Sequence, residues 1–91
     1  MPLDYSEAVK WYRLAAERGD VFGFIGLGNL YEIGKGVPMD YVLAYMWFNL
    51  AAAKGGTKPA ESRDEVAKLM TPEQIAEAQR LAREWKPTLP K

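Results

Sequence analysis

The chain has 91 residues, enough for one small domain, and its twelve basic residues (Lys and Arg) balance its twelve acidic ones. Because no run of like charge occurs, the sequence lacks the electrostatic footprint of a nucleic-acid-binding protein, and we expect no nucleic acid among its partners. Cysteine and histidine are both absent, so we expect no disulfide, no metal ion or other cofactor, and no histidine-activated nucleophile.

The first predicted helix runs from Asp4 to about Arg18. Asp4 is a favourable N-cap residue, and Gly19 stands where many helices end in a left-handed conformation. Asp20 can then cap a second helix over residues 21–33 after almost no loop. These signals predict two helices joined by a tight turn.

A turn and a third helix follow. Two glycines and a proline between residues 34 and 38 predict the turn, and Asp40 can cap a helix that continues to Lys54. This third helix is apolar on nearly all of its sides, so we expect other helices to cover it from several directions. The first helix is more amphipathic and therefore belongs nearer an edge of the fold.

The last third of the chain carries weaker signals. A fourth helix is expected over residues 59–70. Thr71 and Gln74 form the pattern of a capping box, so a fifth helix should begin there and end near Trp85. Residues 87–91 are expected to be a tail.

One segment of the sequence occurs twice. Residues 4–19 reappear as residues 40–55, which is a spacing of 36 residues. A period of this length with helical spacing is typical of solenoids, in which stacked helix pairs bury each other's apolar faces. We therefore predict an all-α fold, an α/α superhelix of about five helices in antiparallel pairs. The identical positions are Asp4/Asp40, Tyr5/Tyr41, Ala8/Ala44, Trp11/Trp47, Leu14/Leu50, Ala15/Ala51, Ala16/Ala52 and Gly19/Gly55.

Small and aromatic residues recur at fixed spacing between positions 20 and 55. The matching positions are Gly23, Leu27, Gly28, Tyr31, Gly34, Gly36, Val37, Asp40, Tyr41, Ala44, Trp47, Phe48, Ala51, Ala52 and Gly55. In this pattern the chain resembles the Sel-one-like repeat family, a relative of the tetratricopeptide repeat. The resemblance implies a helical scaffold that holds proteins together, in bacteria often within signalling, envelope or host-interaction complexes. One departure is Gly23, where the family usually has alanine, and we expect it to weaken the second helix by about 0.5–1 kcal/mol.

We expect a single helical-repeat domain over residues 1–91. Its parts are the second helix of a partial repeat (4–19), a complete repeat (20–55), a degenerate capping repeat (56–86) and the tail (87–91). Because a solenoid usually needs about three stacked units, we expect the chain to pair with a second copy as a homodimer. The alternative is a self-assembling fragment of a longer repeat protein with a structural role.

One stripe of the second helix faces away from the predicted stack and carries two large apolar residues. In helix-pair solenoids the first helix of each unit lines the concave surface, so this stripe is predicted to bind a protein or peptide partner of unknown identity. In the alternative reading, the fourth helix or local curvature covers the stripe. The predicted protein-binding residues are Phe22, Gly26, Asn29 and Ile33.

An enzymatic function is a further alternative, because some cysteine-rich members of the resembling family have been credited with hydrolysis of β-lactams. This chain has no cysteine, and neither Ser6 nor Ser62 stands in a nucleophile motif. The glycines around Lys35 depart from a phosphate-binding loop in their spacing. We therefore predict a non-enzymatic scaffold with no catalytic residues.

The beginning of the chain has no basic segment followed by an apolar stretch, and no segment approaches about 18 uninterrupted apolar residues. We therefore expect no membrane partner and a cytoplasmic location for the chain as given. A periplasmic or secreted location stays open if an upstream signal was removed.

Overall fold

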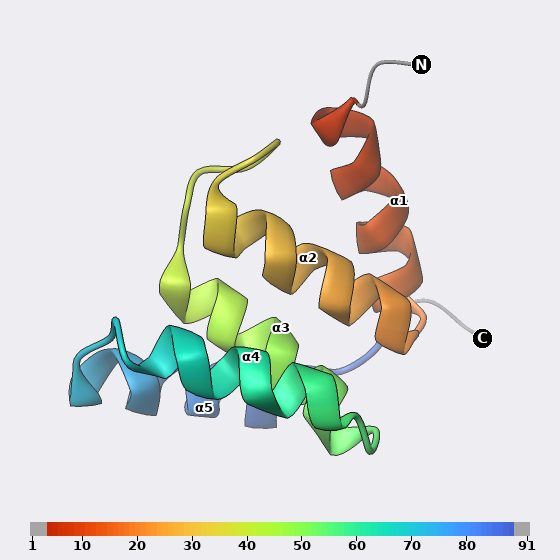
Figure 1. The fold of residues 1–91 in the computed structure, drawn as a ribbon. Helices are drawn as coiled ribbons and strands as arrows, with labels where there is room; N and C mark the ends of the chain where they lie inside the picture. The colour runs from red at the N-terminus through yellow and green to blue at the C-terminus, as the bar shows by residue number, and fades with distance from the viewer. Residues whose placement is uncertain (1–3, 89–91) are drawn as a thin grey trace.

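The computed structural model describes residues 4–88. Within this range the chain forms five α-helices and no strand (Figure 1). The predicted all-α fold with five helices is confirmed. The helices are α1 (Tyr5–Glu17), α2 (Val21–Ile33), α3 (Tyr41–Ala53), α4 (Thr57–Ala67) and α5 (Pro72–Glu84).

Side-chain caps begin four of the five helices. The carboxylates of Asp4, Asp20 and Asp40 accept hydrogen bonds from backbone amides in the first turns of α1, α2 and α3. At α5, the Thr71 hydroxyl accepts from the Gln74 amide while the Gln74 side chain accepts from the Thr71 amide. Because these bonds are local, the predicted starts of these helices agree with the structure.

The fourth helix begins two residues and ends three residues earlier than the predicted range of 59–70. Pro59 lies in the first turn of α4, where its missing N–H is not needed, so the helix starts before the proline. After α4 ends, the amides of Lys68 to Met70 donate to carbonyls three residues earlier, which tightens the chain into a turn.

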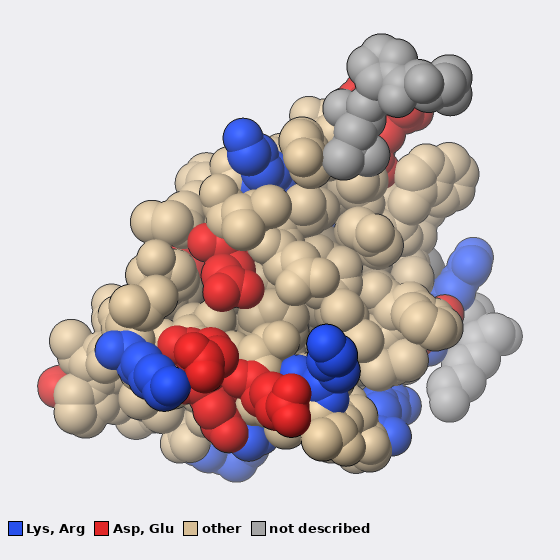
Figure 2. All heavy atoms as spheres, in the orientation of Figure 1, with Lys and Arg blue, Asp and Glu red and all other residues tan. Residues whose placement is uncertain are grey.

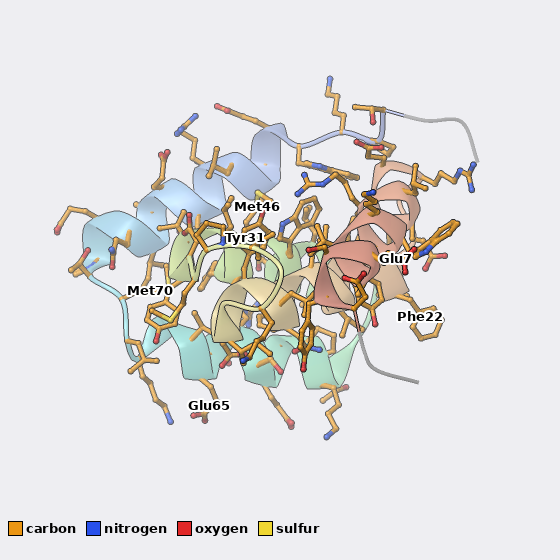
Figure 3. All side chains as sticks on the ribbon, turned by 90° about the horizontal axis from the view of Figure 1, so that it is seen from above. Glu7, Phe22, Tyr31, Met46, Glu65 and Met70 are labelled. Carbon is orange, nitrogen blue, oxygen red and sulfur yellow. The ribbon has the colours of Figure 1, made fainter. Side chains whose placement is uncertain are left out.

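The apolar helix α3 lies at the centre of the molecule. The helices α2, α4 and α5 each pack against it, whereas α1 packs against α2. Seen from above, α4 and α5 lie on opposite sides of the central helices (Figure 3). Helix α1 forms one edge of the molecule (Figure 1). The predicted central position of the third helix and edge position of the first therefore agree with the structure.

An aromatic triad joins three helices in the core. Phe24 of α2 stacks on Trp47 of α3, and both rings meet Trp85, which follows α5, edge to face at 5.1 and 5.9 Å between centroids. A second cluster lies where α4 and α5 cover α3, around Val66 and Ala78. Trp85 thereby ties the end of the last helix to the centre of the fold.

The segment after α5 returns to the end of α1. The amide of Thr88 donates to the carbonyl of Glu17 at 2.9 Å, and Pro87 lies against Gly19. The first part of the expected tail is therefore in contact with the first helix. Residues 89–91, the rest of that tail, lie outside the described residues.

Gly23 marks the point where α1 and α2 come closest. A Cβ atom at this position would lie 2.4 Å from the backbone nitrogen of Ala16 and 2.6 Å from the carbonyl oxygen of Tyr12. These are backbone atoms, which cannot move aside as a side chain can. The expected weakening of the second helix stays a prediction, and the structure adds that the glycine permits the close contact between α1 and α2.

Candidate protein-interaction surface

The outward stripe of α2 is exposed along most of its length. Phe22 has 73% of its surface exposed and Ile33 has 56%, and Asn29 between them is also exposed. The side chain of Phe22 points away from the body of the molecule (Figure 3). The Asp20 cap fixes the first turn that carries Phe22, since its carboxylate accepts the Phe22 amide at 2.9 Å.

Gly26, the fourth predicted binding residue, is buried. A Cβ atom there would meet the ring of Tyr12 at 2.5 Å, so the phenol ring of Tyr12 lies directly on this glycine. Tyr12 itself remains 37% exposed. At this point of the stripe, Tyr12 of α1 therefore takes the place of Gly26 at the surface.

Met39 adds an apolar side chain at the other end of the stripe. Gly34 ends α2 in the left-handed conformation, at φ of 71°, and the chain then doubles back. This return brings Met39 against Gly34, the residue that follows Ile33. A Cβ atom added to Gly34 would lie 3.1 Å from the Cβ atom of Met39, and Met39 is 58% exposed. We call Tyr12, Phe22, Asn29, Ile33 and Met39 together the α2 surface.

Charge is sparse around the α2 surface. Charged side chains gather over α4 at the lower edge of the molecule, while the area over α2 is largely uncharged (Figure 2). Glu32 is the one charged residue within α2, and it is half-buried. Lys35 follows the helix, with its ammonium group 5.9 Å from the ring centroid of Tyr5. The apolar stripe thus has an acidic and a basic group near its Ile33 end.

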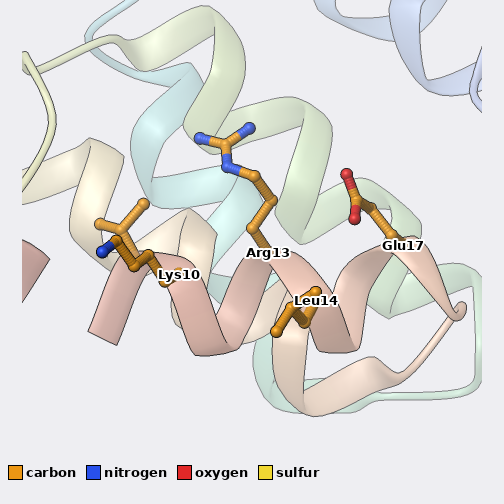
Figure 4. A pocket seen from close by; sticks show the side chains of 5 residues that line it. Lys10, Arg13, Leu14 and Glu17 are labelled. Atoms are coloured by element: carbon orange, nitrogen blue, oxygen red, sulfur yellow. The ribbon is translucent and has the colours of Figure 1, made fainter. Parts of the chain in front are cut away.

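A shallow pocket lies elsewhere, along one face of α1 (Figure 4). Its volume is about 320 Å³, and all of its lining residues come from this one helix. Arg13, one of the lining residues, also donates to the Tyr31 hydroxyl at 3.4 Å. None of the predicted binding residues lines this pocket. The lining residues are Val9, Lys10, Arg13, Leu14 and Glu17.

The described residues contain no cluster of metal-ligating side chains. Within residues 4–88 no group of three His, Cys, Asp or Glu side chains is placed to hold a metal ion.

The side chain of Arg80 donates hydrogen bonds to Glu77 and Glu84, and these bonds raise the pKa of this arginine above its usual value. This network lies on the solvent side of α5, where paired charges are common. None of the described helices is long and apolar enough to cross a membrane.

The comparison with protein families explains the repeat. A family model of the Sel1 repeat matches residues 1–20 and 25–56, which is more than half of the chain. The chain belongs to the Sel1 repeat family. Sel1 repeats generally serve as non-enzymatic helical scaffolds for protein–protein interaction. No match to a curated protein accompanies the family match, so the family alone informs the function of this Sel1 repeat protein.

Two residues of the α2 surface, Tyr12 and Met39, were not among the binding residues predicted from the sequence. Tyr12 corresponds to Phe48 in the repeat, and Phe48 is a buried core residue, so the repeat did not indicate that Tyr12 would join this surface. The one available signal was Gly26, since a glycine within a helix often marks the close approach of a large neighbour. No pattern in the sequence indicated that Met39 would lie against Gly34, the residue that follows Ile33.

Proposed function

We propose that this Sel1 repeat protein is a non-enzymatic scaffold that binds a segment of a partner protein on the α2 surface. The observation that carries the proposal is the exposure of three large apolar side chains, Phe22, Ile33 and Met39, each of them more than half exposed. Apolar residues exposed singly are common, but several of them along one helix with a single charged residue, and in the segment that follows it, are typical of an interaction site.

The spacing of these residues suits a short apolar segment. Phe22 and Ile33 stand at opposite ends of α2, about 16 Å apart along the helix axis. Phe22 and Ile33 then act as anchors, and the Asn29 amide and Tyr12 hydroxyl lie between them as hydrogen-bonding groups for a peptide backbone. Glu32 and Lys35 would set the direction of the segment through opposite charges at the Ile33 end. We place this surface on the concave side of the repeat stack.

We also propose that the chain associates with a second copy of itself. Trp11 is 68% exposed and Leu14 is 41% exposed on the edge helix α1. Both residues repeat at Trp47 and Leu50, which pack into the core. The apolar edge of α1 supports a homodimer, or assembly within a longer repeat protein with a structural role.

No specific observation favours a hydrolase. Ser6 lies on α1 and Ser62 lies on α4, so the two hydroxyls belong to different helices. The chain contains no histidine that would activate either of them.

A peptide-display selection against the immobilised chain tests the scaffold function. We expect enrichment of peptides with two apolar anchors, and at least about a tenfold weaker affinity after Phe22→Glu or Ile33→Glu. Leu69→Glu is the matched control, because Leu69 is 61% exposed but lies in the turn before α5. Equal binding by all three variants, or no enriched peptide, would refute the α2 surface as the binding site.

A further inference from the structure

The outer face of α1 carries four exposed residues in a self-complementary order. Glu7, Trp11 and Leu14 of α1 and its C-cap residue Arg18 follow one another at spacings of four, three and four residues, which places them on one stripe. Their stripe lies opposite Val9 and Ala16, the two residues of α1 that are buried on the α2 side. We call these four residues the α1 stripe.

The repeat itself shows that this kind of helix face is built for packing. Trp47, the counterpart of Trp11, is only 8% exposed because Phe24 and Trp85 cover it. Trp11 occupies the same place in its helix and is 68% exposed. None of the described helices lies on the outer side of α1, which is the right-hand edge of the molecule in Figure 1.

We propose that the α1 stripe is the surface through which two copies of this protein pair, with their α1 helices antiparallel. This inference deepens the self-association proposed above and does not depend on the α2 surface. In the antiparallel arrangement, Glu7 of each copy faces Arg18 of the other, and Trp11 of each copy faces Leu14 of the other. This pairing follows from the order of the four residues along the helix. When the second copy runs in the opposite direction, its base lies against the acid of the first copy and its leucine lies against the indole of the first copy.

Charge selects the antiparallel arrangement over the parallel one. Parallel helices would set Glu7 against Glu7 and Arg18 against Arg18, which are repulsive pairs. The flanks of the stripe agree with the antiparallel choice. Lys10 and Glu17 lie on one flank, where an antiparallel partner brings the lysine of one copy near the glutamate of the other. Ala15 lies on the opposite flank and leaves room for the indole of the partner.

The dimer should be weak, because a pair of 13-residue helices is a small interface. Sedimentation velocity from about 10 µM to 1 mM measures its dissociation. We expect Glu7→Arg alone and Arg18→Glu alone to weaken the dimer by about tenfold, since each turns two attractive pairs into two repulsive ones. The double variant Glu7→Arg/Arg18→Glu restores both attractive pairs and should recover most of the affinity. Circular dichroism confirms that each variant keeps its helices.

Disulfide trapping tests the orientation without relying on charge, because the natural chain has no cysteine. A mixture of Glu7→Cys chains with Arg18→Cys chains should cross-link readily under oxidation. Glu7→Cys chains alone should not, since the two thiols would be about 16 Å apart along antiparallel helices. Preferential cross-linking of Glu7→Cys chains to each other would overturn the antiparallel arrangement.

The outcomes separate this inference from the proposals above. A monomer throughout the concentration range would refute self-association together with the α1 stripe. A dimer that survives Trp11→Ala but is lost in Phe22→Glu would refute the α1 stripe and move the self-contact to the α2 surface. A charge-swapped double variant that fails to recover the affinity, while remaining folded, would also refute the stripe. A monomer, or a charge swap that fails to recover the affinity, leaves the peptide-binding proposal standing, because peptide binding is measured at low micromolar concentration.

Discussion

The ring of Phe24 stacks on the indole of Trp47, with ring centroids 5.7 Å apart and planes inclined by 23°. Phe24 belongs to α2 and Trp47 to α3, so the contact joins the two helices of the predicted complete repeat. Both side chains are almost fully buried, and Trp85 closes the cluster from the end of α5. The stability of the fold should therefore depend strongly on this cluster.

Trp47→Ala should lower the free energy of unfolding by about 3–5 kcal/mol, because it removes a large buried side chain and leaves a cavity. Trp11→Ala should lower it by less than about 1 kcal/mol, since the Trp11 indole is mostly in solvent. Denaturant unfolding at low micromolar concentration, where the monomer prevails, measures both values. Similar losses in the two variants would contradict the assignment of α3 to the centre and α1 to the edge.

Gly23→Ala should destabilise the protein by about 1–3 kcal/mol, although alanine is the better helix former. The added methyl group would press on the backbone of α1, only 2.4 Å from the nitrogen of Ala16. Gly26→Ala is the matched comparison, because the atoms nearest to its methyl group belong to the partly exposed side-chain ring of Tyr12 and not to backbone. Thermal unfolding of both variants gives the comparison. A Gly23→Ala protein more stable than the natural one would show that α1 and α2 can separate at little cost.

Thr88→Pro should cost about 0.5–1.5 kcal/mol of stability, because proline lacks the N–H that donates to the Glu17 carbonyl. Thr88→Ala keeps this N–H and should leave the stability nearly unchanged. Hydrogen exchange at the end of α1 provides a local readout, which should speed up in the proline variant alone. Identical exchange in the two variants would mean that the contact between the tail and α1 contributes nothing.

Thr71→Ala should cost about 1 kcal/mol, because the amide of Gln74 loses its side-chain acceptor at the start of α5. Thr71→Ser keeps a hydroxyl and should retain most of that stability. Thermal melting followed by circular dichroism at equal concentrations compares them. If the serine variant is as unstable as the alanine variant, the threonine acts through packing of its methyl group and the cap is unimportant.

Local signals explain why so much of the fold was predictable. The N-caps at Asp20 and Asp40 and the left-handed glycine at position 34 act within a few residues of themselves, so they can be read directly from the chain. The bounds of α2 follow from these signals. The repeat of residues 4–19 at 40–55 also indicated the helical stack, because repeated apolar faces must pack against one another. The fourth helix was predicted less well, since Gly56 provides no side-chain cap.

The candidate surface depended on contacts that no local pattern contains. Helical periodicity fixes which residues share a face, so the stripe of Phe22, Asn29 and Ile33 was predictable from the sequence. The position of Tyr12 over Gly26 within that stripe depends on how α1 packs against α2.

The same distinction separates Trp11 from Trp47, which occupy identical places in the repeat but differ in exposure, 68% against 8%. The sequence determined the type of side chain and its place on a helix face, through interactions that span one or two turns. The tertiary structure decided which of the two indoles is buried, because burial depends on whether another helix lies alongside. Here α2 and the end of α5 flank Trp47, while none of the described helices covers the outer face of α1.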